Sequence, residues 1–294
     1  MTVAQPVEAS PRRSDASAIG ALKFTRRRES WVAQSAGHFY KIVRASDDAM
    51  HDFVDPACIA SAQREYGDMR FLHGIDAAAC CPERIEQACI VYPVLSGPDM
   101  HELLTRRPAC EQATQCLQAA MLLLARLHCH KADGLPVKNY QLEGFLAPGP
   151  RVMARMRDRQ RMLVVTGFEA RNFRFDKHEA GWFFFDPHHL WCGFPEEDFA
   201  RFMVSLLMIR GKRGGPRPWT GFDRFALLAT YEASTHAKLD RELLDYFVRE
   251  QLAKRQFYAM RLARHMRSPG NVIGVAYTRL YFQRLHRVLE TLRF

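Results

Sequence analysis

Long apolar segments are scarce in this 294-residue sequence. The longest runs, AAMLLLA near residue 119 and FMVSLLMI near residue 202, fall far short of the roughly 18 residues that a membrane-spanning helix needs. The first twenty residues are rich in Ser, Ala and Pro and contain no apolar stretch typical of a signal peptide, so they predict a disordered tail. These absences favour a cytoplasmic protein.

Paired cysteines are also missing. None of the eight cysteines lies in a C-x-x-C motif, which argues against a zinc ribbon and, in a chain of this length, against a disulfide framework. The sequence around His128, Cys129 and His130 comes nearest to a metal cluster, but packing and capping at a helix end is the favoured explanation. Internal repeats are absent too. With 48% hydrophobic and 25% charged residues, the chain has the composition of a globular protein with a sizeable core.

Strand and helix patterns are unevenly distributed. Aromatic and β-branched runs predict strands at 38–43, 88–95, 161–168, 171–176 and 181–186. Helical patterns occur at about 59–74, after the capping pair Asp99 and Glu102, over 115–128, and throughout the chain from residue 195 onward. The last helix is expected to bury a stripe of Tyr277, Leu280, Tyr281, Leu285, Val288 and Leu292. This distribution predicts an α+β protein.

Basic residues are concentrated towards the C-terminal end. The formal net charge is +10, and residues 249–294 contain ten Lys or Arg against two Glu; further basic clusters lie at 151–161 and 209–219. Such surfaces attract phosphate groups on lipids, glycans or nucleic acids. The sequence has no nucleic-acid recognition motif, so we do not expect that partner. Contact with a membrane surface or an anionic glycolipid stays open beside a merely solvated basic face.

Asp186 occupies an unusual position. It directly follows Phe183, Phe184 and Phe185, which predict a buried strand, and a carboxylate at such a strand end is costly unless it has a partner. A metal ion is one such partner, and a simple turn before Pro187 is the alternative.

The order of these elements resembles the protein-kinase-like fold, from about Leu22 to about Ile209. More narrowly, it is similar to the branch that contains lipopolysaccharide kinases and aminoglycoside phosphotransferases. The resemblance implies a two-lobed α+β fold, with a small mixed β-rich N-lobe and a mainly helical C-lobe. Residues 1–20 would then be the tail, 21–95 the nucleotide-binding N-lobe and 96–294 the C-lobe.

The resemblance assigns roles to individual residues. Lys41 in FYKIV corresponds to the phosphate-binding lysine and Glu65 to its helical partner, although both can also be ordinary surface residues. Backbone groups around Tyr92 and Val94 would meet an adenine edge. Asn172, 14 residues before Asp186, completes a pair that would hold Mg²⁺ beside ATP. One further acid, Asp198, would fix the backbone of the catalytic loop.

The catalytic loop departs from the family pattern. The position of the family's general-base aspartate, five residues before the Asn, is Gly167. Glu169 and then Asp133 are the candidate replacements, and the absence of any base is favoured over either. The glycine-rich loop is reduced as well, because only Gly37 directly precedes the lysine strand.

Two classes of function follow. The first is an ATP- and Mg²⁺-dependent phosphotransferase that acts on a sugar hydroxyl of an envelope glycolipid or polysaccharide precursor, in the cytoplasm or peripheral to the inner face of the membrane. The second is a catalytically inactive pseudokinase that serves as a binding or regulatory partner in envelope polysaccharide biosynthesis. The retained Lys, Glu, Asn and Asp favour the enzyme, whereas the absent aspartate favours the pseudokinase.

Overall fold

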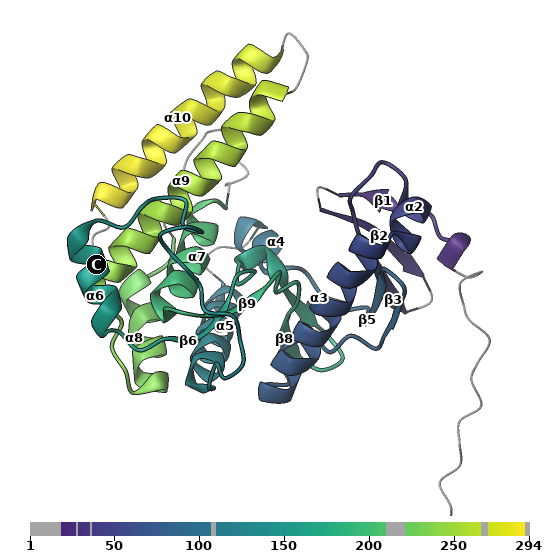
Figure 1. Ribbon diagram of the computed structural model, residues 1–294, viewed down its shortest axis with the longest axis horizontal. Helices are drawn as coiled ribbons and strands as arrows, with labels where there is room; N and C mark the ends of the chain where they lie inside the picture. Colours follow the sequence, from purple (N-terminus) through teal and green to yellow (C-terminus); the bar gives the residue numbers. More distant parts are fainter. Residues whose placement is uncertain are drawn as a thin grey trace, which may run out of the picture. The chain divides into compact units, whose positions relative to one another are not determined.

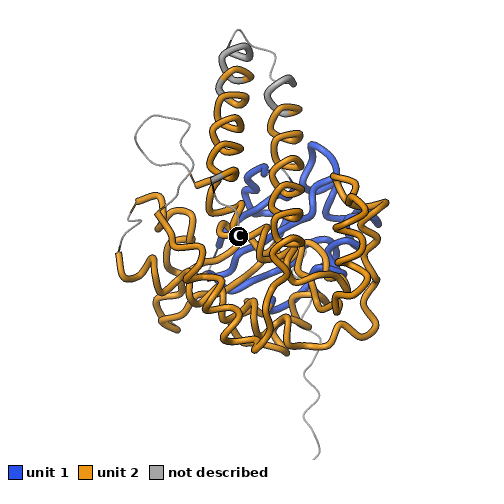
Figure 2. The backbone as a smooth tube through the Cα atoms, turned by 90° about the vertical axis from the view of Figure 1, so that its left-hand side faces the viewer, with its two compact units in different colours: residues 1–66, 82–94 blue, residues 67–81, 95–294 orange. Residues whose placement is uncertain are grey.

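The computed structural model describes residues 19–27, 29–35, 37–106, 110–209, 221–265 and 270–291. Most of the N-terminal tail expected at 1–20, and nearly all of the basic cluster at 209–219, lie outside these residues. The chain divides into two compact units, the first formed by residues 1–66 and 82–94 and the second by residues 67–81 and 95–294 (Figure 2).

The first unit is built on a five-stranded antiparallel sheet with the order β1-β2-β3-β5-β4 (Figure 1). Its strands are β1 (Thr25–Arg26), β2 (Ser30–Ser35), β3 (His38–Val43), β4 (Arg84–Glu86) and β5 (Cys89–Pro93). Strand β5 lies between β3 and β4 and is buried along most of its length, which explains its near-continuous apolar sequence. The strands predicted at 38–43 and 88–95 are confirmed.

Two helices follow β3 in the chain. Helix α2 spans Ala49–Val54 and is capped by Asp48, whose side chain accepts a hydrogen bond from the backbone N–H of Met50 at 2.9 Å. Helix α3 spans Pro56–Ile75, so its residues up to 66 belong to the first unit and the others to the second. The helix predicted at 59–74 is therefore confirmed with small changes at its ends.

The second unit is mainly helical. Its helices are α4 (Met100–Arg106), α5 (Glu111–Cys129), α6 (Pro150–Asp158), α7 (Pro195–Leu207), α8 (Arg224–Thr235), α9 (Arg241–His265) and α10 (Gly270–Thr291). Helix α5 buries the predicted face, including Leu117, Met121, Leu124 and Leu127. Together with the sheet of the first unit, these helices confirm the α+β class.

Two small ladders interrupt the helices of the second unit. Strand β6 (Met162–Val165) pairs with β9 (Leu190–Gly193), and β7 (Phe173–Asp176) pairs with β8 (Gly181–Phe184); η1 (Ala170–Asn172) is a single 3₁₀ turn before β7. The predicted strand pair at 171–176 and 181–186 is confirmed, but β9 was not predicted. Phe168, Phe173, Phe184 and Phe202 pack ring against ring beneath the loops that join these strands.

Helices α9 and α10 lie side by side as an antiparallel pair (Figure 1). Among the side chains of α10 that the structure describes, Tyr281, Phe282 and Leu285 are buried and pack with Leu207 and Leu252. The side chains of Tyr277 and Leu292, which belong to the predicted stripe, lie outside the described part. Leu280 is 43% exposed, so the predicted stripe was wrong at that position, and Phe282 occupies the contact instead. In the part of the chain that the structure describes, no helix is long and apolar enough to cross a membrane.

Candidate functional site

Lys41 and Glu65 form a buried ion pair in the first unit. The Lys41 ammonium donates to both carboxylate oxygens of Glu65 at 2.7 Å, and the hydroxyl of Tyr92 donates to the same carboxylate at 3.0 Å. Strand β3 supplies the lysine, α3 the glutamate and β5 the tyrosine. A lysine on a half-buried strand needs such a counter-charge, and the predicted pair is confirmed. The hydroxyl of Tyr92 is an additional support that the sequence did not indicate.

The backbone around Val94 is already engaged. Its N–H donates to the carbonyl oxygen of Gly37 at 3.0 Å, and the backbone of Tyr92 pairs with Phe39 in the ladder between β3 and β5. Gly37 sits in the tight turn between β2 and β3 with φ of 82°, a left-handed conformation that glycine adopts without strain. A ligand that uses the Val94 N–H would have to displace this contact.

Asn172 and Asp186 are brought together in the second unit. Asn172 ends η1, and its side-chain amide donates to the carbonyl oxygens of Gly167 at 2.8 Å and of Asp186 at 3.2 Å. Asp186 lies two residues after β8 with φ of 62°, which turns the chain sharply. Of the three preceding phenylalanines only Phe184 is buried, so the prediction of a fully buried run was wrong for Phe183 and Phe185. The side-chain nitrogen of Asn172 faces carbonyl groups, so its oxygen is the atom left for a metal.

The half-exposed carboxylate of Asp186 and this amide oxygen are ligand types that Mg²⁺ accepts alongside phosphate oxygens. No group of three or more His, Cys, Asp or Glu within the described residues could hold a metal by itself. The fit to a magnesium nucleotide therefore depends on the phosphates supplying further oxygens.

Gly167 occupies the position of the missing base, and the position has no room for a side chain. A Cβ there would overlap the carbonyl oxygen of Asp186 and would lie 2.7 Å from the carbonyl carbon of Pro187. The Gly167 N–H also donates to the Pro187 carbonyl oxygen at 2.8 Å. The segment that follows β8 thus packs directly on the backbone of the loop, and this close approach explains why glycine is present.

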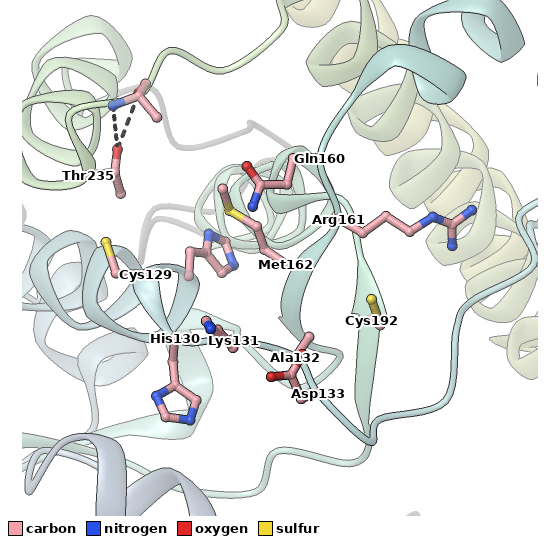
Figure 3. Close-up of a pocket in the computed structure, with 12 residues that line it drawn as sticks. Cys129, His130, Lys131, Ala132, Asp133, Gln160, Arg161, Met162, Cys192 and Thr235 are labelled. Carbon is pink, nitrogen blue, oxygen red and sulfur yellow. Dashed lines mark hydrogen bonds between the residues drawn. The ribbon is translucent and has the colours of Figure 1, made fainter.

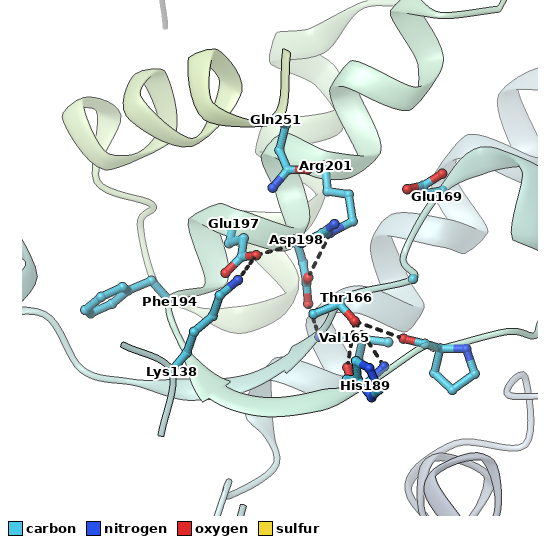
Figure 4. Close-up of polar contacts among 12 residues, drawn as sticks. Lys138, Val165, Thr166, Glu169, His189, Phe194, Glu197, Asp198, Arg201 and Gln251 are labelled. Atoms are coloured by element: carbon cyan, nitrogen blue, oxygen red, sulfur yellow. Dashed lines mark hydrogen bonds and ion pairs between the residues drawn. The ribbon is translucent and has the colours of Figure 1, made fainter. Parts of the chain in front are cut away.

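Asp198 fixes the start of this loop. It lies fully buried in the first turn of α7, and its carboxylate accepts a hydrogen bond from the Val165 N–H at 2.5 Å (Figure 4). His128 contacts the same oxygen at 3.3 Å, and Arg201 lies 3.9 Å from the other. Burial raises the pKa of Asp198, although the contact with His128 opposes this effect. The predicted role of Asp198 in fixing the loop backbone is confirmed.

Glu169 is buried between two arginines. One oxygen lies 2.7 Å from the guanidinium of Arg255 on α9, and the other lies 2.9 Å from that of Arg171. Burial alone would raise the pKa of Glu169, but Arg255 and then Arg171 outweigh it and hold the pKa below its usual value. Glu169 is therefore an anion held in place beside the loop.

Asp133 lies elsewhere in the second unit. It is exposed and lines a cavity of about 600 Å³ beside the C-terminal end of α5, together with Lys131, Gln160 and Arg161 (Figure 3). Met162, at the start of β6, borders this cavity, whereas Gly167 follows the other end of that strand. The two candidate bases are thus associated with opposite ends of β6.

Comparison with known proteins shows the fold. No family model matches the chain, and no curated protein matches it in sequence. A putative aminoglycoside phosphotransferase from Ralstonia eutropha superimposes with a TM-score of 0.58 at 15% identity, covering 92% of each chain. The choline kinase LicA from Streptococcus pneumoniae gives a TM-score of 0.55 at 11% identity, covering 94% of this chain and 96% of that one.

A choline/ethanolamine kinase family protein from Mesorhizobium loti gives a TM-score of 0.53 at 14% identity, covering 94% of this chain and 90% of that one. The chain therefore has the kinase-like fold of the aminoglycoside phosphotransferases and choline kinases, as the sequence predicted.

Proposed function

We propose that this protein is an ATP- and Mg²⁺-dependent phosphotransferase with an altered catalytic loop. The observation that carries the proposal is the buried pair of Lys41 and Glu65, supported by Tyr92. Three polar groups in the interior of a small sheet unit carry a desolvation cost, and a role in holding phosphates explains why the ammonium is kept there. Two aminoglycoside phosphotransferases with the same fold hold ATP and ADP in their structures, which supports a nucleotide as the ligand.

The metal would be held by Asp186 and Asn172. Bound Mg²⁺ would neutralise charge on the phosphates, and phosphoryl transfer depends mainly on positioning and on such charge neutralisation. The residues of this chain then contribute the positioning: Asp198 fixes the backbone at Val165, and the amide of Asn172 joins the Gly167 and Asp186 carbonyls. Glu169 is the carboxylate nearest to Gly167 in the chain and our candidate proton acceptor, with Asp133 second.

The acceptor in this proposal is a sugar hydroxyl of an anionic glycolipid or polysaccharide precursor. The basic C-terminal part of the chain, with ten Lys or Arg against two Glu over residues 249–294, supports an acceptor that carries negative charge. A peripheral contact with the inner face of the membrane would bring the enzyme to such a substrate.

The second candidate is a pseudokinase that binds nucleotide without transferring phosphate, as a partner in the same kind of biosynthesis. The closed position at Gly167 favours it, because no aspartate fits there while the segment at Asp186 and Pro187 keeps its place.

Turnover separates the two candidates. General-base help is worth about 10² to 10⁴ in rate, so Glu169→Gln should lower turnover by that factor with nucleotide affinity unchanged if the protein is an enzyme that uses this base.

Thermal unfolding with and without Mg-ATP tests nucleotide binding itself. We expect Mg-ATP to raise the Tm of the wild type, Asp186→Asn to remove most of the shift, and Lys41→Met to reduce it. Lys238→Gln is a suitable control, because Lys238 is an exposed cation on the segment between α8 and α9. Equal shifts for the wild type and Asp186→Asn would contradict the metal assignment.

A further inference from the structure

One face of α9 carries two aromatic rings between two cations. Lys254, Phe257, Tyr258 and Arg261 are spaced i, i+3, i+4 and i+7, so they share one side of the helix. Phe257 is 49% exposed and Tyr258 is 38% exposed, although α9 packs on α7 and on α10. Singly exposed aromatic residues are ordinary, but adjacent ones bracketed by cations form a surface with defined chemistry.

The segment between β-bridge residue Val137 and α6 adds a third ring to this face. Phe145 is 39% exposed, and its ring centroid lies 5.4 Å from that of Phe257. Its backbone N–H donates to Glu250 at 2.9 Å, and the neighbouring Leu146 carbonyl accepts from the hydroxyl of Tyr246 at 2.6 Å. Two residues of α9 thus hold the segment in place, so the three rings form a built surface. We call Phe145, Lys254, Phe257, Tyr258 and Arg261 the α9 patch.

Lys254 is the unusual member of the α9 patch. It is half-buried, yet it has no hydrogen-bond or ion-pair partner among the described residues. The nearby carboxylate of Glu250 is already used by the Phe145 N–H and by the side-chain amide of Gln251. Burial and then the adjacent guanidinium of Arg201 lower the pKa of Lys254, and the carboxylate of Glu250 only partly opposes them. A cation in this environment is stabilised by an added anion.

The patch also adjoins the candidate loop through the next residue of the helix. Arg255 follows Lys254 and binds Glu169 at 2.7 Å, so α9 connects the loop that carries Asn172 with the exposed rings. The helix that carries the α9 patch is therefore in direct contact with the loop.

We propose that the α9 patch binds a lipid that carries a phosphate group, with the rings against its apolar or sugar part and Lys254 and Arg261 on its phosphate. Aromatic and cationic side chains together are the usual composition of protein surfaces that meet anionic membranes. The patch would present the lipid-linked acceptor to the loop, and in this respect the inference rests on the proposed function. A nucleic acid is less suited, because the sequence has no nucleic-acid recognition motif. A second copy of the chain is tested below by the oligomeric state.

Co-sedimentation with lipid vesicles, without nucleotide, tests the proposal. We expect binding to phosphatidylglycerol vesicles and much weaker binding to phosphatidylcholine vesicles. Lys254→Gln should weaken binding about fivefold, because a cation near an anionic surface contributes about that factor. The double variant Phe257→Ser, Tyr258→Ser should weaken it at least about tenfold, because the apolar contact is lost. Soluble glycerol phosphate in millimolar excess should not compete.

The matched controls change the same residue types elsewhere in the second unit. Lys238→Gln removes an exposed cation, and Phe225→Ser removes an aromatic residue that is 53% exposed on α8; neither should alter vesicle binding. Equal losses in these controls, equal binding to both kinds of vesicle, or no binding at low salt would overturn the proposal. A changed oligomeric state of the double variant with unchanged vesicle affinity would also overturn it.

The result is separable from the proposed function. The Tm shift with Mg-ATP is measured on the same variants and should stay as in the wild type for Lys254→Gln. If vesicle binding fails while the Tm shift with Mg-ATP persists, only the proposal for the α9 patch is refuted. If Mg-ATP does not shift the Tm while vesicle binding is normal, the proposal of nucleotide binding is refuted instead.

Discussion

At the scale of single residues, the loop between β6 and β7 is held by contacts that lie far apart in the sequence. Asp198 still fixes the Val165 N–H, and Asn172 still meets the segment at Asp186. Between them, Gly167 lets the Asp186 and Pro187 backbone approach so closely that no side chain fits. The sequence revealed the missing aspartate, but the close approach depends on residues about 20 positions apart and could not be predicted from it.

An aspartate at position 167 should therefore harm the protein. Gly167→Asp must displace the segment at Asp186 and Pro187, and we expect a loss of more than about 2 kcal/mol in the free energy of unfolding, measured by urea titration. We also expect no gain in phosphoryl transfer. Gly67→Ala is the control, because a Cβ at Gly67 in α3 meets nothing within 4 Å, and it should stabilise the protein by up to about 1 kcal/mol. A Gly167→Asp variant as stable as the wild type would show that the loop moves freely.

The stability contribution of Glu169 should depend on pH. Its pKa in the folded protein lies below the usual value because Arg255 and Arg171 outweigh burial. The unfolded chain therefore binds the proton more readily, so this contribution is complete above the unfolded pKa of about 4.3 and is lost as the pH falls through the lower folded pKa. Glu169→Gln should cost about 2 kcal/mol at pH 7, because it leaves the largely buried Arg255 without its counter-charge.

The measurement is the free energy of unfolding of both proteins at pH 7, 5 and 3.5. The difference should stay constant from pH 7 to 5 and then shrink. Glu242→Gln, which alters the exposed pairs with Arg151 and Arg155, should change stability little at any pH. A difference that is the same at pH 7 and at pH 3.5 would contradict an ionised Glu169.

At the scale of helices and strands, local pattern was a good guide where one face is buried. The face of α5, the strand pair β7 and β8, and the helices from residue 195 onward follow directly from apolar spacing. Strand β9 was missed because Leu190–Gly193 is short and is defined only by pairing with β6. The buried face of α10 could not be predicted in full either. Leu280 and Phe282 are both apolar, and only the contact with Leu207 and Leu252 determines that Phe282 is the buried one.

The contact of Asp198 on α7 with the end of β6 should contribute more to the free energy of unfolding than an ordinary helix cap does. Asp198→Ala leaves the Val165 N–H buried without an acceptor and removes a partner from His128, so we expect a loss of about 3 kcal/mol or more in the free energy of unfolding. Asp223→Ala is the matched control. Asp223 caps the exposed start of α8, and its loss should cost about 1 kcal/mol. Similar losses for both variants would mean that Asp198 acts only as a cap.

At the scale of the whole molecule, the net charge can be counted directly from the sequence and does not depend on the fold. The net charge of +10 holds for any structure, whereas the pairing of Glu169 with Arg255, 86 positions apart, could only come from the structure. Attraction by net charge is long-ranged and screened by salt, while contact through aromatic rings is short-ranged and little affected by it. The two contributions to vesicle binding should therefore separate in a salt titration.

Arg279, Arg284 and Arg287 on α10 supply the test of the long-range part. Arg279 and Arg287 are exposed and Arg284 is half-buried, and none belongs to the α9 patch. Changing all three to Gln should weaken binding to phosphatidylglycerol vesicles at low salt, and changing all three to Glu should weaken it about twice as much on a logarithmic scale, since the charge change doubles. Both losses should fade above a few hundred millimolar NaCl, where the Debye length falls to about 5 Å or less.

The loss caused by Phe257→Ser with Tyr258→Ser should instead stay nearly constant as salt rises. Co-sedimentation at 20, 150 and 500 mM NaCl measures both behaviours on the same proteins. If the Gln and Glu versions of α10 weaken binding equally, those arginines make specific contacts and the long-range interpretation is wrong. If the loss from the ring substitutions fades with salt as the charge effect does, the rings do not enter the lipid and the α9 patch acts only through its cations.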